Sequence, residues 1–357
     1  MISAVAGHPS AWLQRHRGQK PVFTCVLSFT ETGLIPHISA AGLTPQARRY
    51  TALADSEFLI NGGAANPRRS LPTLAGGVSP AVISRAILTS LEIPIHLLTT
   101  GLAEQLNAPY IQLPPVLAKS VRTGQAMSLG QANALLASGL RWGRRLAQSG
   151  RYLIVSECVV GGTTTAQAVL TALGYDIAGK MSSSHRASNH AQKQAIVAQG
   201  LAVWSKAGNR SALSAVAAVG DPMQIVTAGM AIAASQQGGV LLAGGSQMLA
   251  VYALATAIAH ERSLSWHREH VVVGTTRWVI EDASADTVAI AQSVKAPYLM
   301  SHINFNESPY FQLRAFEQGY VKEGMGAGGC AIAASLYKGW TRSQLRHAVE
   351  AQLRQYL

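Results

Sequence analysis

The sequence predicts an α/β protein with a mostly parallel sheet, helices on both faces, and a small second subdomain from the N-terminal and C-terminal segments. Short apolar runs recur along the chain, each ends in Gly, Thr or Ser, and a helix-compatible stretch follows each one. The runs are continuous rather than alternating, which is typical of strands buried on both faces. Strand–helix alternation in turn favours parallel strands joined by crossovers. We interpret residues 1–357 as one such domain, with the subdomain built from about 1–56 and 335–357.

Six runs are predicted to be strands, and they lie at residues 22–29, 57–63, 95–101, 152–157, 240–246 and 271–276. Ligands of open parallel sheets bind at the carboxyl ends of the strands, so the polar turns after these runs predict the site. The tail 341–357 predicts an amphipathic helix, because Leu345, Val349 and Leu353 recur every four residues. That helix fits either a docked surface element or a dimer contact.

The composition is that of a folded protein whose basic surface fits either an anionic partner or no partner at all. Of 357 residues, 48% are hydrophobic and 13% charged, the reverse of a disordered chain. The net charge of +12 favours anions. The arginines form small scattered groups without a basic helix or an aromatic RNA-binding motif, which argues against nucleic acid. Three distant cysteines form no CxxC pair, so we expect no metal site, no cofactor and no disulfide framework.

One uncharged window, residues 240–259, has the length of a membrane span. Gly244, Gly245 and Ser246 near its start instead favour a strand, a turn and a buried helix. The N-terminus has no apolar stretch long enough for a signal peptide. We therefore expect a cytoplasmic protein that does not contact a membrane.

The segment from Tyr152 to Gly174 predicts an anion site. A strand ends near Glu157, Gly161 and Gly162 form a tight turn, and one of the next three residues, Thr163, Thr164 or Thr165, is expected to cap the following helix. Backbone N–H groups at a helix N-terminus bind phosphate well. No Lys follows the glycines, so this is not a Walker A loop. An ordinary glycine-rich turn with a Thr cap remains the alternative.

The second candidate is Glu323, a carboxylate among glycines. Gly324, Gly326 and Gly329 match GxGxxG, but no long apolar strand precedes them and about 30 residues remain, which argues against a dinucleotide site. A poorly solvated carboxylate has a raised pKa and is a better general base near neutral pH. The alternative is a Glu that interacts only with the dipole of the next helix.

These motifs, taken in order, resemble the nicotinate-nucleotide:dimethylbenzimidazole phosphoribosyltransferase family, most closely its archaeal and cyanobacterial branch. The stretches that carry the resemblance are IPHISAAGLTPQARRYTALADSEFLINGG (35–63), RTGQAMSLGQANALLASG (122–139), ECVVGGTTTAQAVLTALGY (157–175), VGDP (219–222), LLAGGSQMLAVYALA (241–255), TTRWV (275–279) and GYVKEGMGAGG (319–329).

The resemblance implies a homodimer that transfers 5-phosphoribose from nicotinate mononucleotide to the base that becomes the lower ligand of a cobamide. It implies that Glu323 is the general base and Glu157 the acid at the strand end. The implied phosphate and nucleotide contacts are Gly161, Gly162, Thr163, Thr164, Thr165, Lys193, Asp221, Gly244, Gly245, Gly324 and Gly326. Ser39 falls near the family's base pocket.

Two alternatives stay open. The first is a magnesium-dependent transferase that uses phosphoribosyl pyrophosphate, although Glu157 lacks the second adjacent acid of that class. The second is a non-catalytic protein that binds a mononucleotide. This chain also departs from the family at Cys158 to Val160 and at His37. The acceptor is therefore open among dimethylbenzimidazole, other benzimidazoles, adenine and phenols.

Overall fold

A computed structural model describes residues 1–63, 68–72, 76–147 and 151–357. Within these residues, eight strands form one sheet in the order β1-β8-β7-β6-β5-β2-β3-β4. Only β1 runs antiparallel, against β8, so the predicted mostly parallel α/β sheet is confirmed. The strands are β1 (Ile2–Ala6), β2 (Val22–Ser28), β3 (Ile95–Thr100), β4 (Ile111–Gln112), β5 (Leu153–Cys158), β6 (Val240–Ala243), β7 (Val271–Thr276) and β8 (Tyr298–Ser301).

The chain reverses its direction across the sheet at β2. From β2 it adds β3 and β4 on one side, then returns to β5 on the other side and continues outward to β8. Helices at such a switch point diverge to opposite faces and leave a crevice at the carboxyl ends of the two strands. The crevice expected between β2 and β5 lies directly beside the segment that follows Glu157.

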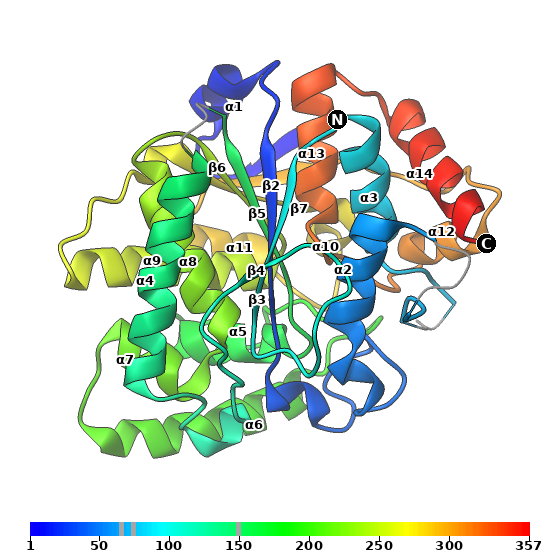
Figure 1. The fold of residues 1–357 in the computed structure, drawn as a ribbon. Coiled ribbons are helices and arrows are strands. Elements are labelled where there is room, and N and C mark those ends of the chain that lie inside the picture. The colour runs from blue at the N-terminus through cyan, green and yellow to red at the C-terminus, as the bar shows by residue number, and fades with distance from the viewer. Residues whose placement is uncertain (64–67, 73–75, 148–150) are drawn as a thin grey trace.

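Helices cover both faces of the sheet (Figure 1). Those of the first face, on the left of the view, pack on Val26, Val155 and Val273, and α6 adds a further layer against α5 and α7. They are α4 (Leu129–Leu146), α5 (Gly162–Ala172), α6 (His190–Trp204), α7 (Ala212–Val219), α8 (Pro222–Ser235), α9 (Ser246–Glu261) and α11 (Thr287–Ser293).

The second face carries the remaining α-helices, which pack on Phe23, Ile154 and Val272. They are α1 (Ser10–His16), α2 (Thr51–Asn61), α3 (Ala81–Ser90), α10 (Arg277–Ile280), α12 (Phe311–Glu317), α13 (Ala327–Lys338) and α14 (Arg342–Tyr356). The predicted C-terminal helix is thus present as α14, and its Leu345, Val349 and Leu353 are buried against the core that includes α3.

The strand predicted at residues 57–63 is wrong. These residues end helix α2, and Gly62 closes it with φ +74° and an N–H that donates to the Phe58 carbonyl. A short apolar run fits a strand and a buried helix end equally well, which is why the pattern misled. The other five predicted strands correspond to β2, β3, β5, β6 and β7.

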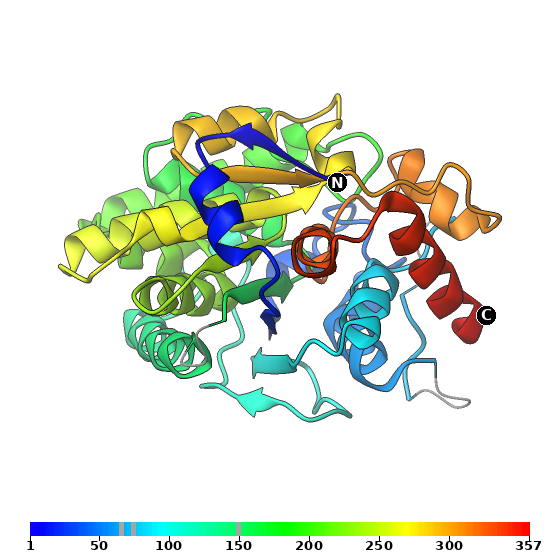
Figure 2. The same cartoon turned by 90° about the horizontal axis from the view of Figure 1, so that it is seen from above.

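The N-terminus lies at the edge of the sheet, where β1 pairs with β8, and the C-terminus lies at the outer end of α14 (Figure 2). Strands β1 and β2, which fall in the segment 1–56, belong to the main sheet, and α14 packs against α3. The division into a main domain and a small subdomain therefore stays a prediction, and it receives no support from β1 or β2. The window 240–259 folds as β6, a turn and most of α9. Among the residues described, no helix is long and apolar enough to cross a membrane.

Candidate active site

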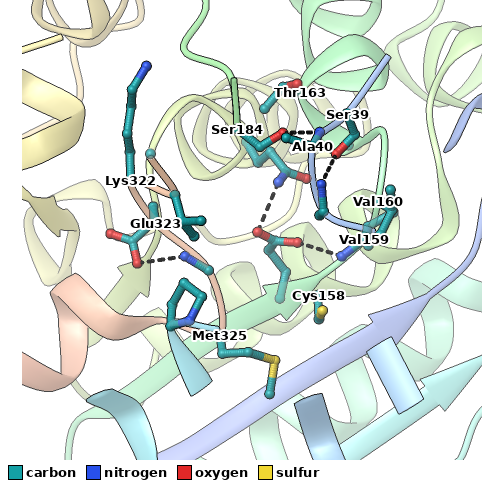
Figure 3. A pocket seen from close by; sticks show the side chains of 18 of the residues that line it. Ser39, Ala40, Cys158, Val159, Val160, Thr163, Ser184, Lys322, Glu323 and Met325 are labelled. Atoms are coloured by element: carbon teal, nitrogen blue, oxygen red, sulfur yellow. Dashed lines mark hydrogen bonds between the residues drawn. The ribbon is translucent and has the colours of Figure 1, made fainter. Parts of the chain in front are cut away.

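A cavity lies at the carboxyl edge of the sheet, where the turns after β5 and β6 meet the loop before α13 (Figure 3). The empty space between its walls amounts to about 940 Å³, a volume that includes open solvent. Eight residues predicted from the sequence line it: Ser39, Glu157, Gly161, Gly162, Thr163, Gly245, Glu323 and Gly324. The structure thus brings the two candidate carboxylates and the glycine turn together.

The other predicted site residues lie outside the lining of this cavity: Thr164, Thr165, Lys193, Asp221, Gly244 and Gly326. Thr165 and Asp221 are fully buried behind the turn, where the Thr165 hydroxyl donates to Asp221 Oδ2 at 2.5 Å. Lys193 is also fully buried, and its Nζ donates to the Ser182 carbonyl at 3.0 Å. These polar groups support the walls of the cavity from behind.

Glu323 is held by a hydrogen bond network that uses both carboxylate oxygens. Oε1 accepts from the N–H groups of Gly324 and Gly328, each at 3.1 Å. Oε2 accepts from the Thr275 hydroxyl at 2.9 Å and from the Thr276 N–H at 3.0 Å. Burial raises the pKa of Glu323, and these hydrogen bonds oppose the rise. The carboxylate is therefore fixed in orientation at the end of β7.

Gly328, in the glycine-rich segment after Glu323, allows close packing between α13 and β7. A Cβ at Gly328 would lie 2.2 Å from the Thr275 carbonyl carbon, so only glycine lets α13 approach the end of β7 this closely. This approach carries the Gly328 N–H, in the first turn of α13, to Glu323. The N-terminus of α13 and the Glu323 carboxylate therefore interact directly. This contact is also expected from the alternative in which Glu323 interacts with the dipole of that helix.

Glu157 ends β5 and is 6% exposed. Its Oε2 accepts from the Val159 N–H and its Oε1 from the Gln247 side chain, both at 2.9 Å. Burial, and secondarily the charge of Asp221, raises its pKa to about 8. The raised pKa favours the protonated form of Glu157, and in that form the carboxyl group can donate a hydrogen bond.

The turn before α5 differs in detail from the prediction. No Thr side chain caps the helix; Gly161 occupies the N-cap with φ +87°, which a residue with a Cβ adopts poorly. The amides of Gly162, Thr164 and Thr165 donate to carbonyls within the turn. Thr163 is the threonine that reaches the cavity, so it is the one positioned to contact a phosphate there.

Hydroxyl groups gather at one end of the cavity. Ser39 Oγ lies 3.1 Å from Ser184 Oγ, which also accepts from the Ala40 N–H at 2.9 Å. In Figure 3, Ser39, Thr163 and Ser184 lie in the upper part of the view, whereas the sulfur atoms of Cys158 and Met325 lie below. Ser39 therefore belongs to the hydroxyl-rich end, which suits a phosphate or sugar better than an apolar base.

Sequence reasoning missed several polar residues of the lining, among them Asp55 and Gln247. Asp55 lies in α2, the segment predicted in part as a strand, so no pattern pointed to it. Gln247 follows Gly244, Gly245 and Ser246 at the start of α9, where a polar residue after a strand was a usable signal. Lys322, the cation beside Glu323 in sequence, forms a buried pair with Asp282 at 2.6 Å instead of with Glu323.

Comparison with known proteins identifies the family. A family model described as phosphoribosyltransferase matches residues 81–272, more than half of the chain. A UPF0284 protein of Cyanothece sp. (strain PCC 7425) is 56% identical, covering 96% of this chain and 93% of its own. A UPF0284 protein of Trichodesmium erythraeum is 53% identical, covering 95% and 94%.

Solved structures share the fold. That of a nicotinate-nucleotide-dimethylbenzimidazole phosphoribosyltransferase from Thermus thermophilus matches with a TM-score of 0.62 at 18% identity, covering 96% of this chain and 86% of its own. The resemblance drawn from the motifs is confirmed. The chain belongs to the phosphoribosyltransferase family, with the UPF0284 proteins as relatives, and is a pentosyltransferase enzyme.

Proposed function

We propose that this enzyme transfers the 5-phosphoribosyl group of nicotinate mononucleotide to an azole base of benzimidazole type. The products are nicotinate and an α-ribazole-phosphate-type nucleotide, used in assembly of the cobamide nucleotide loop. The observation that carries the proposal is that Glu323, Glu157 and the turn before α5 line one cavity. Two buried carboxyl groups beside a group of hydroxyls suit this transfer, because one can accept the azole proton while the hydroxyls hold the phosphate.

Glu323 acts as the general base in this mechanism. It takes the proton from one ring nitrogen of the azole while the lone pair of the other ring nitrogen attacks C1′ of the ribose. The bond between C1′ and the pyridinium nitrogen breaks, and its electron pair leaves with nicotinate from the opposite face. The anomeric configuration therefore inverts. The hydrogen bonds to Glu323 fix its orientation before the azole arrives.

Glu157 and the hydroxyl-rich end hold the donor. Protonated Glu157 donates a hydrogen bond to a sugar oxygen, and Gln247 keeps it in place. Thr163, Ser183 and Ser184 supply hydroxyl groups for the 5′-phosphate. Binding energy from this remote group positions C1′ between the leaving nicotinate and the acceptor, which is how orientation lowers the barrier.

The proposal is tested by incubating the protein with nicotinate mononucleotide and 5,6-dimethylbenzimidazole and following both nicotinate and the new nucleotide by chromatography. Stoichiometric formation of both products in the presence of EDTA is the expected result. Transfer only from phosphoribosyl pyrophosphate with magnesium would support the first alternative. Tight mononucleotide binding with no product from any azole would support the second.

We also propose that the enzyme works as a homodimer, as its family resemblance implies. The measurement is light scattering coupled to size-exclusion chromatography, in which a dimer gives twice the 37.6 kDa of one chain. A mass of one chain at micromolar concentration would contradict this.

A further inference from the structure

Asp55 is a buried carboxyl group of the cavity that the proposed mechanism does not use. It lies in α2, lines the cavity and is 5% exposed. Its Oδ2 accepts a long hydrogen bond from the Cys158 thiol, at 3.8 Å. Its Oδ1 is buried, and no described residue donates a hydrogen bond to it. A buried polar atom without a partner is costly, so it calls for an explanation.

The surroundings of Asp55 give no structural reason for an acid. Among the ion pairs of the described residues, none involves Asp55. The same helix contains a second acid, Glu57, whose carboxylate does have partners. It forms an ion pair with Arg69 and accepts a hydrogen bond from the Asn107 N–H at 2.9 Å. Burial raises the pKa of Asp55 to about 7, which reflects how poorly its charge is compensated.

Asp55 stands at the apolar end of the cavity, which we define as Pro80, Cys158 and Met325. It contacts Cys158, and Ser79, which precedes Pro80, also lies near its side chain. Pro80 in turn lies against Gly324, the residue after Glu323. The wall from Glu323 to Asp55 is therefore continuous, and its middle is apolar and suited to a flat ring.

We infer that Asp55 accepts a hydrogen bond from the acceptor base and selects azoles that carry an amino group on the six-membered ring. The inference rests on the proposed function, because it places the azole N–H at Glu323. The opposite edge of a fused ring system then faces Asp55. An amino group there supplies the donor that Oδ1 lacks, whereas a methyl group would leave this oxygen buried and unpaired.

The test compares pairs of acceptors that differ only by amino against methyl at the same ring position: 4-aminobenzimidazole against 4-methylbenzimidazole, and 6-aminopurine against 6-methylpurine. The wild-type enzyme should prefer the amino member of each pair by about tenfold or more in kcat/KM. In Asp55→Leu this ratio should fall to about one or reverse, whereas the Kd of nicotinate mononucleotide should stay the same. Asp55→Asn keeps an oxygen acceptor and should retain part of the preference.

Thr51→Val is the matched control, because Thr51 lines the cavity one helical turn from Asp55 and its hydroxyl already donates to the Ala41 carbonyl. It should leave the amino-to-methyl ratio unchanged. Equal kcat/KM for both members of each pair in the wild type would refute the role of Asp55 and leave the proposed function standing. Absence of nicotinate release with every azole would refute both.

Discussion

Replacement of Gly162 by alanine tests how the turn before α5 supports Glu157. A Cβ at this position would lie 1.8 Å from Gln247 Oε1 and 2.6 Å from its Cδ. The side chain of Gln247 is flexible at this end, so it will move rather than the backbone. Gln247 donates to Glu157 Oε1 at 2.9 Å, and that hydrogen bond will be lost when it moves.

The expected loss of stability is small. One hydrogen bond contributes about 1 kcal/mol net, and the higher helix propensity of alanine offsets part of this. The unfolding entropy of about 2.1 cal/mol/K per residue converts about 1 kcal/mol into a drop in Tm of roughly 1–2 °C for 357 residues. The effect on activity should be larger, about ten- to a hundredfold in kcat/KM, because Glu157 is no longer held in place.

Calorimetry and the nicotinate release assay measure these two effects separately. Gly130→Ala is the matched control, since the nearest atom to its new Cβ is the Ser128 hydroxyl at 3.9 Å; it should leave activity unchanged and raise the Tm slightly through helix propensity alone. Full activity of Gly162→Ala would refute the positioning role of Gln247. A Tm loss above about 5 °C would show that the backbone, rather than Gln247, takes the strain.

Two further predictions concern buried charges. The pKa of Glu157 rises to about 8 on folding. The free-energy cost of burying its charge therefore appears as pH increases from about 4.5 to 8 and is present in full above pH 8. Glu157→Gln should therefore gain free energy of unfolding over the wild type across this window, by up to about 1.4 kcal/mol per pH unit; parallel curves in urea titrations would contradict this. The pKa of Lys193 falls to about 7 on folding. The free-energy cost of burying its charge is therefore present in full below pH 7 and disappears toward pH 10.5. The free energy of unfolding that Lys193→Met gains over the wild type should shrink over that range. The difference between exposed Lys206→Met and the wild type should not change with pH in the same titrations.

The sheet was predictable because strands buried on both faces leave long apolar runs. β5 and β7 are buried along their whole length, and both were found. The missed strands are short or lie at the edges: β1 is partly exposed, β4 has two residues and β8 has four. Such strands depend on neighbours that are distant in sequence, and local pattern does not record those neighbours.

The candidate site was predictable where one segment holds both the turn and the polar group. Glu323 directly precedes a glycine, Glu157 lies four residues before Gly161, and both carboxylates line the cavity. Asp55 and Gln247 were missed because their importance comes from contacts across the fold, to Cys158 and to Glu157. Lys193 and Asp221 were chosen because they are polar residues near a motif; both are buried and bonded to protein groups, so their predicted contact with the nucleotide stays a prediction.

The most direct test of the account is Glu323→Gln in single-turnover release of nicotinate with an azole acceptor. Glutamine keeps the shape, and its carbonyl can still accept from Gly324 and Gly328, while its NH2 group replaces the oxygen that accepts from Thr276. Exposed Glu307→Gln serves as the control and should be unaffected. The account predicts a rate lower by roughly 10²–10⁴ with an unchanged Kd for nicotinate mononucleotide. An unchanged rate would contradict the assignment of Glu323 as the general base.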